Sequence, residues 1–184
     1  MTNMYNKEEA GRSMVEMLGV LAIVGVLSIG GISGYSKAMA KYKVNKTLDQ
    51  ISMLVTNIRT TFGNQNSYEG LDAAALITYE LVDREMHPGG NSGLVNAYNG
   101  AITMSVSDDK ISFSFTYSGL PKEACASIAS ANWGDSAASG LVEMQINGTD
   151  NTHSWSGDKK LPILFGTAAS ECNTTLNSIT WKYY

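Results

Sequence analysis

Hydrophobic and polar residues are distributed unevenly along the chain. Residues 17–35 form an uncharged apolar run, which follows a polar N-terminal segment and the acid Glu16. At a rise of 1.5 Å per residue, about 19 helical residues cover the roughly 30 Å hydrocarbon core of a membrane. The pattern therefore predicts a helix whose first half, residues 14–35, spans a membrane.

The helical pattern continues beyond the apolar run but becomes amphipathic. Apolar residues recur at steps of three and four, with no proline among them, at Val44, Leu48, Ile51, Val55, Ile58 and Phe62. This spacing places them on one helix face, while polar residues such as Gln50 and Arg59 occupy the others. Residues 63–67 have turn chemistry, so we expect the helix to end near Phe62. Its apolar face is expected to pack on the rest of the chain, and a coiled-coil seam is the alternative.

Residues 63–184 have the pattern of one globular head built from short elements. Alternating apolar and polar residues predict strands with one buried face around residues 102–106, 111–117, 142–146 and 179–183, and a hairpin turn at 107–110. Short helices are expected at residues 71–82, capped by Asp72, from Pro121 to about Gly134, and at 166–172. Trp133, Trp155 and Trp181 are expected in the core, with contacts between subunits as the alternative.

Composition and charge argue against several functional classes. The 184 residues carry a formal net charge of −4, and the lysines that follow the apolar run are scattered along one helix, so no nucleic-acid surface is evident. His87 and His153 are the only histidines, lie in loop-like sequence and lack metal-ligand spacing. We interpret both as solvated loop residues, and Asp108 and Asp109 as turn residues rather than calcium ligands. No catalytic, metal or cofactor site is predicted.

Glu16 is the most informative single residue, because an unpaired carboxylate at the start of an apolar span is costly. Gly11 precedes it by five positions, within the sequence AGRSMVEMLGVLAI of residues 10–23. This arrangement resembles the processing site of type IV prepilins. The resemblance implies that residues 1–11 are a leader, that a prepilin peptidase cuts after Gly11, and that the new N-terminal amine of Arg12 is methylated. It also implies that Glu16 guides subunits into a filament.

Other interpretations of the N-terminus explain less of it. An ordinary secretory signal has a shorter apolar region and a cleavage site of small residues at its far end. A plain membrane anchor would leave Glu16 unexplained. The chain departs from the family pattern at Arg12, where a hydrophobic residue is usual, and at residues 7–9, where Glu8 and Glu9 accompany Lys7. Lysines after the apolar run would by themselves place that side in the cytoplasm, whereas the resemblance implies the opposite orientation.

The two cysteines, Cys125 and Cys172, allow one intramolecular pairing. Since the resemblance implies export, a disulfide is the expected state. The order of elements, with a long helix, strands, a cysteine-bearing helix and a final aromatic strand, resembles the type IVb pilins, including the pilins of conjugative thin pili. The expected fold class is α+β: residues 12–62 form a helical spine packed on an antiparallel sheet in the head, residues 63–184, which one C-terminal disulfide closes.

The resemblance implies a structural protein rather than an enzyme. Its precursor would lie in the inner membrane, and the inner-membrane pilus assembly machinery would polymerise copies of the matured chain into an extracellular pilus. Such a filament would serve adhesion, aggregation, motility or DNA transfer. A pseudopilin of a type II secretion system and a membrane-anchored periplasmic binding module are the alternatives.

Overall fold

The computed structural model describes residues 6–89, 93–134 and 136–184, with side chains from residue 14 onward. The chain divides between Tyr42 and Lys43 into two compact units. The first contains the N-terminal part of one long helix, and the second contains the rest of that helix together with the sheet and the short helices. Each unit is described by itself below.

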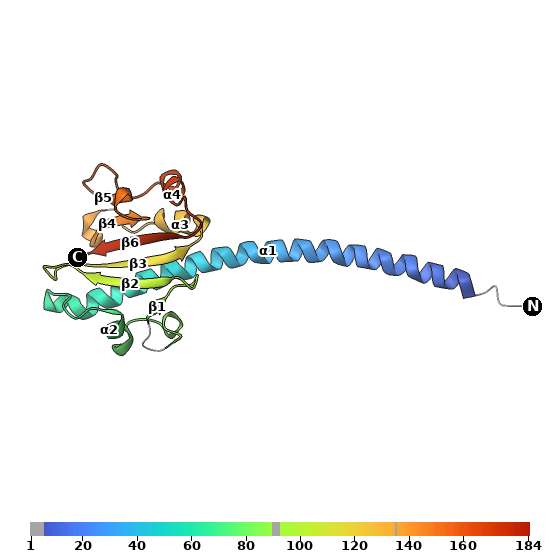
Figure 1. The fold of residues 1–184 in the computed structure, drawn as a ribbon, viewed down its shortest axis with the longest axis horizontal. Helices are drawn as coiled ribbons and strands as arrows, with labels where there is room; N and C mark the ends of the chain where they lie inside the picture. The colour runs from blue at the N-terminus through green and yellow to red at the C-terminus, as the bar shows by residue number, and fades with distance from the viewer. Residues whose placement is uncertain (1–5, 90–92, 135) are drawn as a thin grey trace, which may run out of the picture. The chain divides into compact units, whose positions relative to one another are not determined.

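Helix α1 runs from Asn6 to Phe62 (Figure 1). Its end at Phe62 was expected from the turn residues that follow, and a 3₁₀ turn at Gly63–Gln65 succeeds it. Asn66 then adopts the left-handed conformation with φ of 50°, which asparagine tolerates better than most residues. The expected single long helix is confirmed.

The second half of α1 contributes one wall of the head's core. Ile51, Leu54 and Ile58 are fully buried, so the prediction that the apolar face packs on the chain's own head is confirmed. The head covers a wider face than the apolar stripe alone, because Thr47 and Gln50 are buried as well. Our assignment of Gln50 to a polar, solvated face was therefore wrong.

The sheet is antiparallel at every strand pair and has the order β1-β2-β3-β6-β4-β5. In chain order its strands are Leu94–Val95, Ala101–Val106, Phe113–Leu120, Leu141–Ile146, Thr152–Ser154 and Asn177–Tyr183. The C-terminal strand β6 lies between β3 and β4, so it pairs two strands that are not themselves paired (Figure 1). The last strand of the chain thus holds both halves of the sheet together.

The predicted alternation holds fully in β6 and, from Phe113 to Tyr117, in β3, whose register on β6 shifts between Tyr117 and Leu120. It fails at two predicted positions. Ile111 is 50% exposed, because the turn after β2 extends to residue 112 and β3 begins only at Phe113. Val142 is only half-buried, because the register of β4 on β6 shifts between Leu141 and Glu143, which turns Leu141 into the core instead.

Aromatic side chains form the centre of the core. Phe115 on β3 lies opposite Trp181 on β6 in the strand register, with their ring centroids 5.3 Å apart. Trp133 meets Trp181 edge to face at 5.4 Å, and Trp155 is half-buried against the same core. The expected core position is confirmed for Trp181, whereas Trp133 and Trp155 are half-buried at the edge of the core.

Three short helices flank the sheet: α2 (Ala73–Thr78), α3 (Lys122–Ala129) and α4 (Phe165–Glu171). Asp72 caps α2 as expected, since its Oδ1 accepts a hydrogen bond of 2.7 Å from the Ala75 amide. Both α2 and α3 end several residues before their predicted limits, α2 because Glu80 takes a positive φ of 52° soon after it. Figure 1 shows α3 and α4 together at the β4–β5 end of the sheet and α2 at the β1 end.

Candidate functional site

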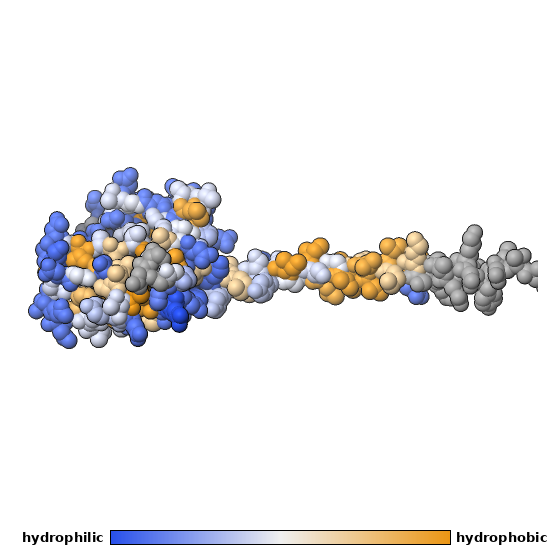
Figure 2. Space-filling model, turned by 60° about the horizontal axis from the view of Figure 1, so that its bottom comes forward, coloured by the Kyte–Doolittle hydropathy of each residue, from blue (hydrophilic) through white to orange (hydrophobic). Residues whose placement is uncertain are grey.

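The first half of α1 exposes an uninterrupted apolar surface. Its large hydrophobic side chains from Met14 to Tyr35 are between 52% and 73% exposed. Figure 2 shows these hydrophobic residues following one another along the helix, whereas hydrophilic residues predominate on the visible face of the head. Among the described residues, α1 is long and apolar enough to cross a membrane. A surface of this kind requires an apolar partner, either lipid or other apolar helices.

Glu16 lies at the N-terminal end of this apolar surface, and its side chain is exposed. Gly11 and Arg12 fall within α1, but their side chains lie outside the described part of the structure. The helix is continuous from Arg12 to Glu16, so four residues, about one turn, separate them. Cleavage after Gly11 and the role of Glu16 in assembly remain predictions.

The disulfide predicted between Cys125 and Cys172 is present, with 5.9 Å between the two Cα atoms. Cys125 lies in α3 and Cys172 is the C-terminal cap residue of α4. Both cysteines are buried. The bridge therefore fixes the two helices at the β4–β5 end of the sheet to each other.

Removal of the bridge should destabilise the head without affecting the N-terminal helix. We expect Cys172→Ser to lower the free energy of unfolding by about 4 kcal/mol, because the loop that the bridge closes is long and its closure restricts the unfolded chain. Urea unfolding of the full chain in detergent micelles under non-reducing conditions measures the loss. Cys125→Ser should give the same loss, and the double variant no more than either single one. Two free thiols in the exported wild-type protein would contradict the assignment.

A buried polar cluster lies beside the disulfide and was not predicted. His153 on β5 is 2% exposed, and its Nε2 lies 2.7 Å from Oε2 of Glu171. Lys159 donates from Nζ to Oε1 of the same carboxylate at 2.8 Å and to Oδ1 of Asn151 at 2.6 Å. The interpretation of His153 as a solvated loop residue was therefore wrong. No periodicity in residues 147–160 indicates this burial, which depends on the pairing of β5 with β4.

The cluster connects three segments through one carboxylate. Burial alone would raise the pKa of Glu171, but hydrogen bonds and charge from Lys159 and His153 outweigh it and hold the pKa below its usual value. The ionised carboxylate accepts both contacts, so His153 donates from Nε2. Because Glu171 directly precedes Cys172, the cluster and the disulfide act on the same end of α4.

The Glu171 cluster predicts acid sensitivity. Since the folded-state pKa lies below the ordinary value of about 4.5, the stability that this carboxylate contributes is fully present above that pH. It is lost as the pH falls from there through the lowered pKa. Glu171→Gln should lower the free energy of unfolding by about 2 kcal/mol at neutral pH and flatten its decline below about pH 4.5. Urea unfolding of both proteins in detergent micelles across this range measures the effect, and parallel pH profiles would contradict it.

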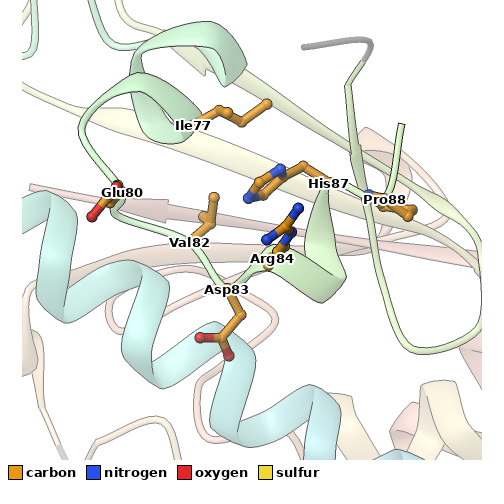
Figure 3. A pocket seen from close by; sticks show the side chains of 7 residues that line it. All are labelled: Ile77, Glu80, Val82, Asp83, Arg84, His87 and Pro88. Carbon is orange, nitrogen blue, oxygen red and sulfur yellow. The ribbon is translucent and has the colours of Figure 1, made fainter. Parts of the chain in front are cut away.

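An open surface cavity of about 510 Å³ lies on the opposite side of the head, at the segment that follows α2 (Figure 3). Its lining combines apolar and charged residues: Ile77, Glu80, Val82, Asp83, Arg84, His87 and Pro88. Figure 3 shows the His87 ring next to the Arg84 side chain, Glu80 on the other side of Val82, and the Asp83 side chain pointing away from the His87 ring. His87 is half-buried here, so the interpretation of this histidine as fully solvated was only partly right. None of the residues that line this cavity carries a hydroxyl or thiol group that His87 could activate.

A long helix with an exposed apolar half, packed on an antiparallel sheet and a disulfide-closed head, defines the type IV pilin class of proteins. Solved structures share this fold. A type IVb pilin from Salmonella typhi matches 76% of this chain and 98% of its own, with a TM-score of 0.54 and 24% identity. TcpA, a type IV pilin from the Vibrio cholerae El Tor biotype, matches 78% of this chain and 99% of its own, also with a TM-score of 0.54, at 10% identity.

The family model described as PilS N terminal matches residues 41–183, and the chain belongs to that family. It is a type IVb-like pilin. Among curated proteins, the major structural subunit of the bundle-forming pilus from two Escherichia coli strains is similar over nearly the whole length. The identities are 26% over 187 residues and 25% over 185 residues, each covering 97% of this chain and 96% of the relative.

Proposed function

We propose that this pilin, a structural subunit of an extracellular type IV pilus, is matured by a prepilin peptidase after Gly11 and polymerises through its N-terminal helix. The precursor is held in the inner membrane by residues 14–35. Assembly machinery in that membrane then transfers the matured subunit into a helical filament. The head, closed by the Cys125–Cys172 bridge, supplies the filament's outer surface.

The exposed apolar half of α1 carries this proposal. About 30 Å of helix with large hydrophobic side chains on all sides cannot remain in water. Lipid covers these apolar side chains before assembly, and the identical helices of neighbouring subunits cover them afterwards. The described core of the head takes nothing from this segment, since every residue described as buried lies at position 47 or later. One element thus serves as membrane anchor and as polymerisation surface in turn.

A type II secretion pseudopilin would use the same helix in the same two ways. The similarity to two major pilus subunits over 97% of the chain favours a pilus subunit over this alternative. A membrane-anchored binding module is less favoured, because it would assign no role to Glu16.

N-terminal sequencing of sheared surface filaments tests the proposal directly. The dominant protein in the sheared material should be this chain and should begin at Arg12. A chain that begins at Met1 would refute cleavage after Gly11. Absence of the chain from the filaments, with the protein retained in the membrane, would instead favour the pseudopilin or the anchored module.

A further inference from the structure

Four lysines and no acids follow the apolar half of α1. Between Glu16 and Asp49 the charged residues are Lys37, Lys41, Lys43 and Lys46 alone. Basic residues that closely flank a membrane span usually keep that flank in the cytoplasm, so these lysines oppose export of the head. We therefore expect these four positive charges to have anionic or aromatic partners.

The head supplies partners for the last two of these lysines. Lys43 lies over the ring of Tyr98, with Nζ 5.5 Å from the ring centroid. Lys46 forms an ion pair with Glu85. Both side chains belong to the same compact unit as their partners and are partly buried in it. The packing of α1 on the head therefore provides partners for the charges of Lys43 and Lys46.

Lys37 and Lys41 belong to the other unit, and both are exposed. Within the described part of the chain, neither has a hydrogen bond or an ion pair. They are four residues apart on a continuous helix, so their ammonium groups lie on the same side, one turn from each other. Two exposed positive charges on one helix face make a site for a divalent anion or for two neighbouring monoanions.

The position of these lysines along the helix identifies the anion. Lys37 follows Glu16 by 21 residues, which is about 31 Å of helix and matches the roughly 30 Å hydrocarbon core. When the apolar segment spans the bilayer, Lys37 lies at the level of the lipid phosphates and Lys41 about 6 Å farther out. Tyr35, just before Lys37, and Tyr42, just after Lys41, are 68% and 56% exposed and lie on roughly the opposite side of the helix. Tyrosines at this depth are typical of a membrane interface.

We propose that Lys37 and Lys41 form a binding site for the phosphate groups of anionic phospholipids in the leaflet on the head's side. This inference rests on the proposed function, because it requires the precursor to span the membrane. The site exists only while the helix is in the bilayer, so it holds the subunit there until assembly. Two lysines near an anionic surface favour this state by roughly 30-fold over a neutral bilayer. Acidic groups of a second copy are the competing occupant of the site.

Lipid selectivity of the full-length chain tests the site. The protein is reconstituted into vesicles of phosphatidylcholine and phosphatidylglycerol in equal amounts and released with mild detergent, and the retained lipids are counted by native mass spectrometry. We expect the wild type to retain phosphatidylglycerol preferentially. The preference should fall by about 30-fold in Lys37→Gln/Lys41→Gln and weaken in about 0.5 M salt. The matched control, Lys122→Gln/Lys160→Gln, removes two exposed lysines of the head and should retain the preference.

Three results would overturn the lipid site. One is an equal preference in the wild type and the Lys37/Lys41 variant, and a second is an equal loss in the control variant. The third is absence of preference in the wild type, in which case weaker self-association of the Lys37/Lys41 variant in phosphatidylcholine vesicles would assign the lysines to a second copy. Resistance of the vesicle-bound protein to alkaline extraction is measured in parallel. Wild-type protein that fails this measurement would refute the membrane step of the proposed function, whereas protein that passes it without lipid preference refutes the lipid site alone.

Discussion

Glu16→Ala is expected to give processed, membrane-inserted protein but few or no filaments. The carboxylate at the edge of the apolar segment needs a positive partner once it leaves water, and the resemblance to type IV pilins implies that the N-terminal amine of a neighbouring subunit supplies it. That pair would set the axial register between helices as a subunit enters the filament. Loss of the acid should therefore abolish assembly while the apolar segment still inserts. Counting sheared filaments and fractionating membranes measures both effects.

Arg12→Phe is the matched variant, because it alters the other member of a possible pair within the same subunit. Arg12 and Glu16 are four apart on α1, at the spacing at which a guanidinium reaches a carboxylate. An internal pair lowers the cost of holding Glu16 in the bilayer but competes with the pair between subunits. We expect Arg12→Phe to preserve filament yield or to raise it. Abundant filaments from Glu16→Ala would remove the role of the acid, and abolished assembly in Arg12→Phe would show that Arg12 is required.

Gly11→Trp should leave all of the protein as full-length precursor in the membrane. A peptidase that cuts after this residue must approach the backbone closely, and a large side chain obstructs it. Gly11→Ala should reduce processing without abolishing it. Immunoblotting separates the precursor from the matured chain by mobility.

Gly19→Trp is the control for this experiment, since it places the same side chain on the same helix away from the cleavage position. A Cβ at Gly19 meets no atom within 4 Å, so the substitution has room in the isolated subunit. Its processing should be normal. A normally processed Gly11→Trp variant would exclude cleavage at Gly11.

The candidate site divides into a part that was predictable and a part that was not. The apolar span and Glu16 are local features, because their meaning depends on residues within one helix and on the surrounding solvent. The cluster of His153, Lys159 and Glu171 is not local. Its members are up to 18 residues apart and lie on a strand, a loop and a helix that only the folded head brings together.

The sequence by itself determined the elements whose hydrophobic period is uninterrupted. Helix α1 ends at Phe62 as its pattern and the following turn residues indicate, and β6 alternates between buried and half-buried residues over its whole length. Such periods act within one element, so no distant partner is needed to find them. The tertiary structure alone decided the order of the strands, the shift in register that buries Leu141 instead of Val142, and the burial of Gln50 and His153. These depend on which surfaces meet; for His153 the fold also brings Glu171 within hydrogen-bond distance of Nε2, which offsets part of the lost contact with water.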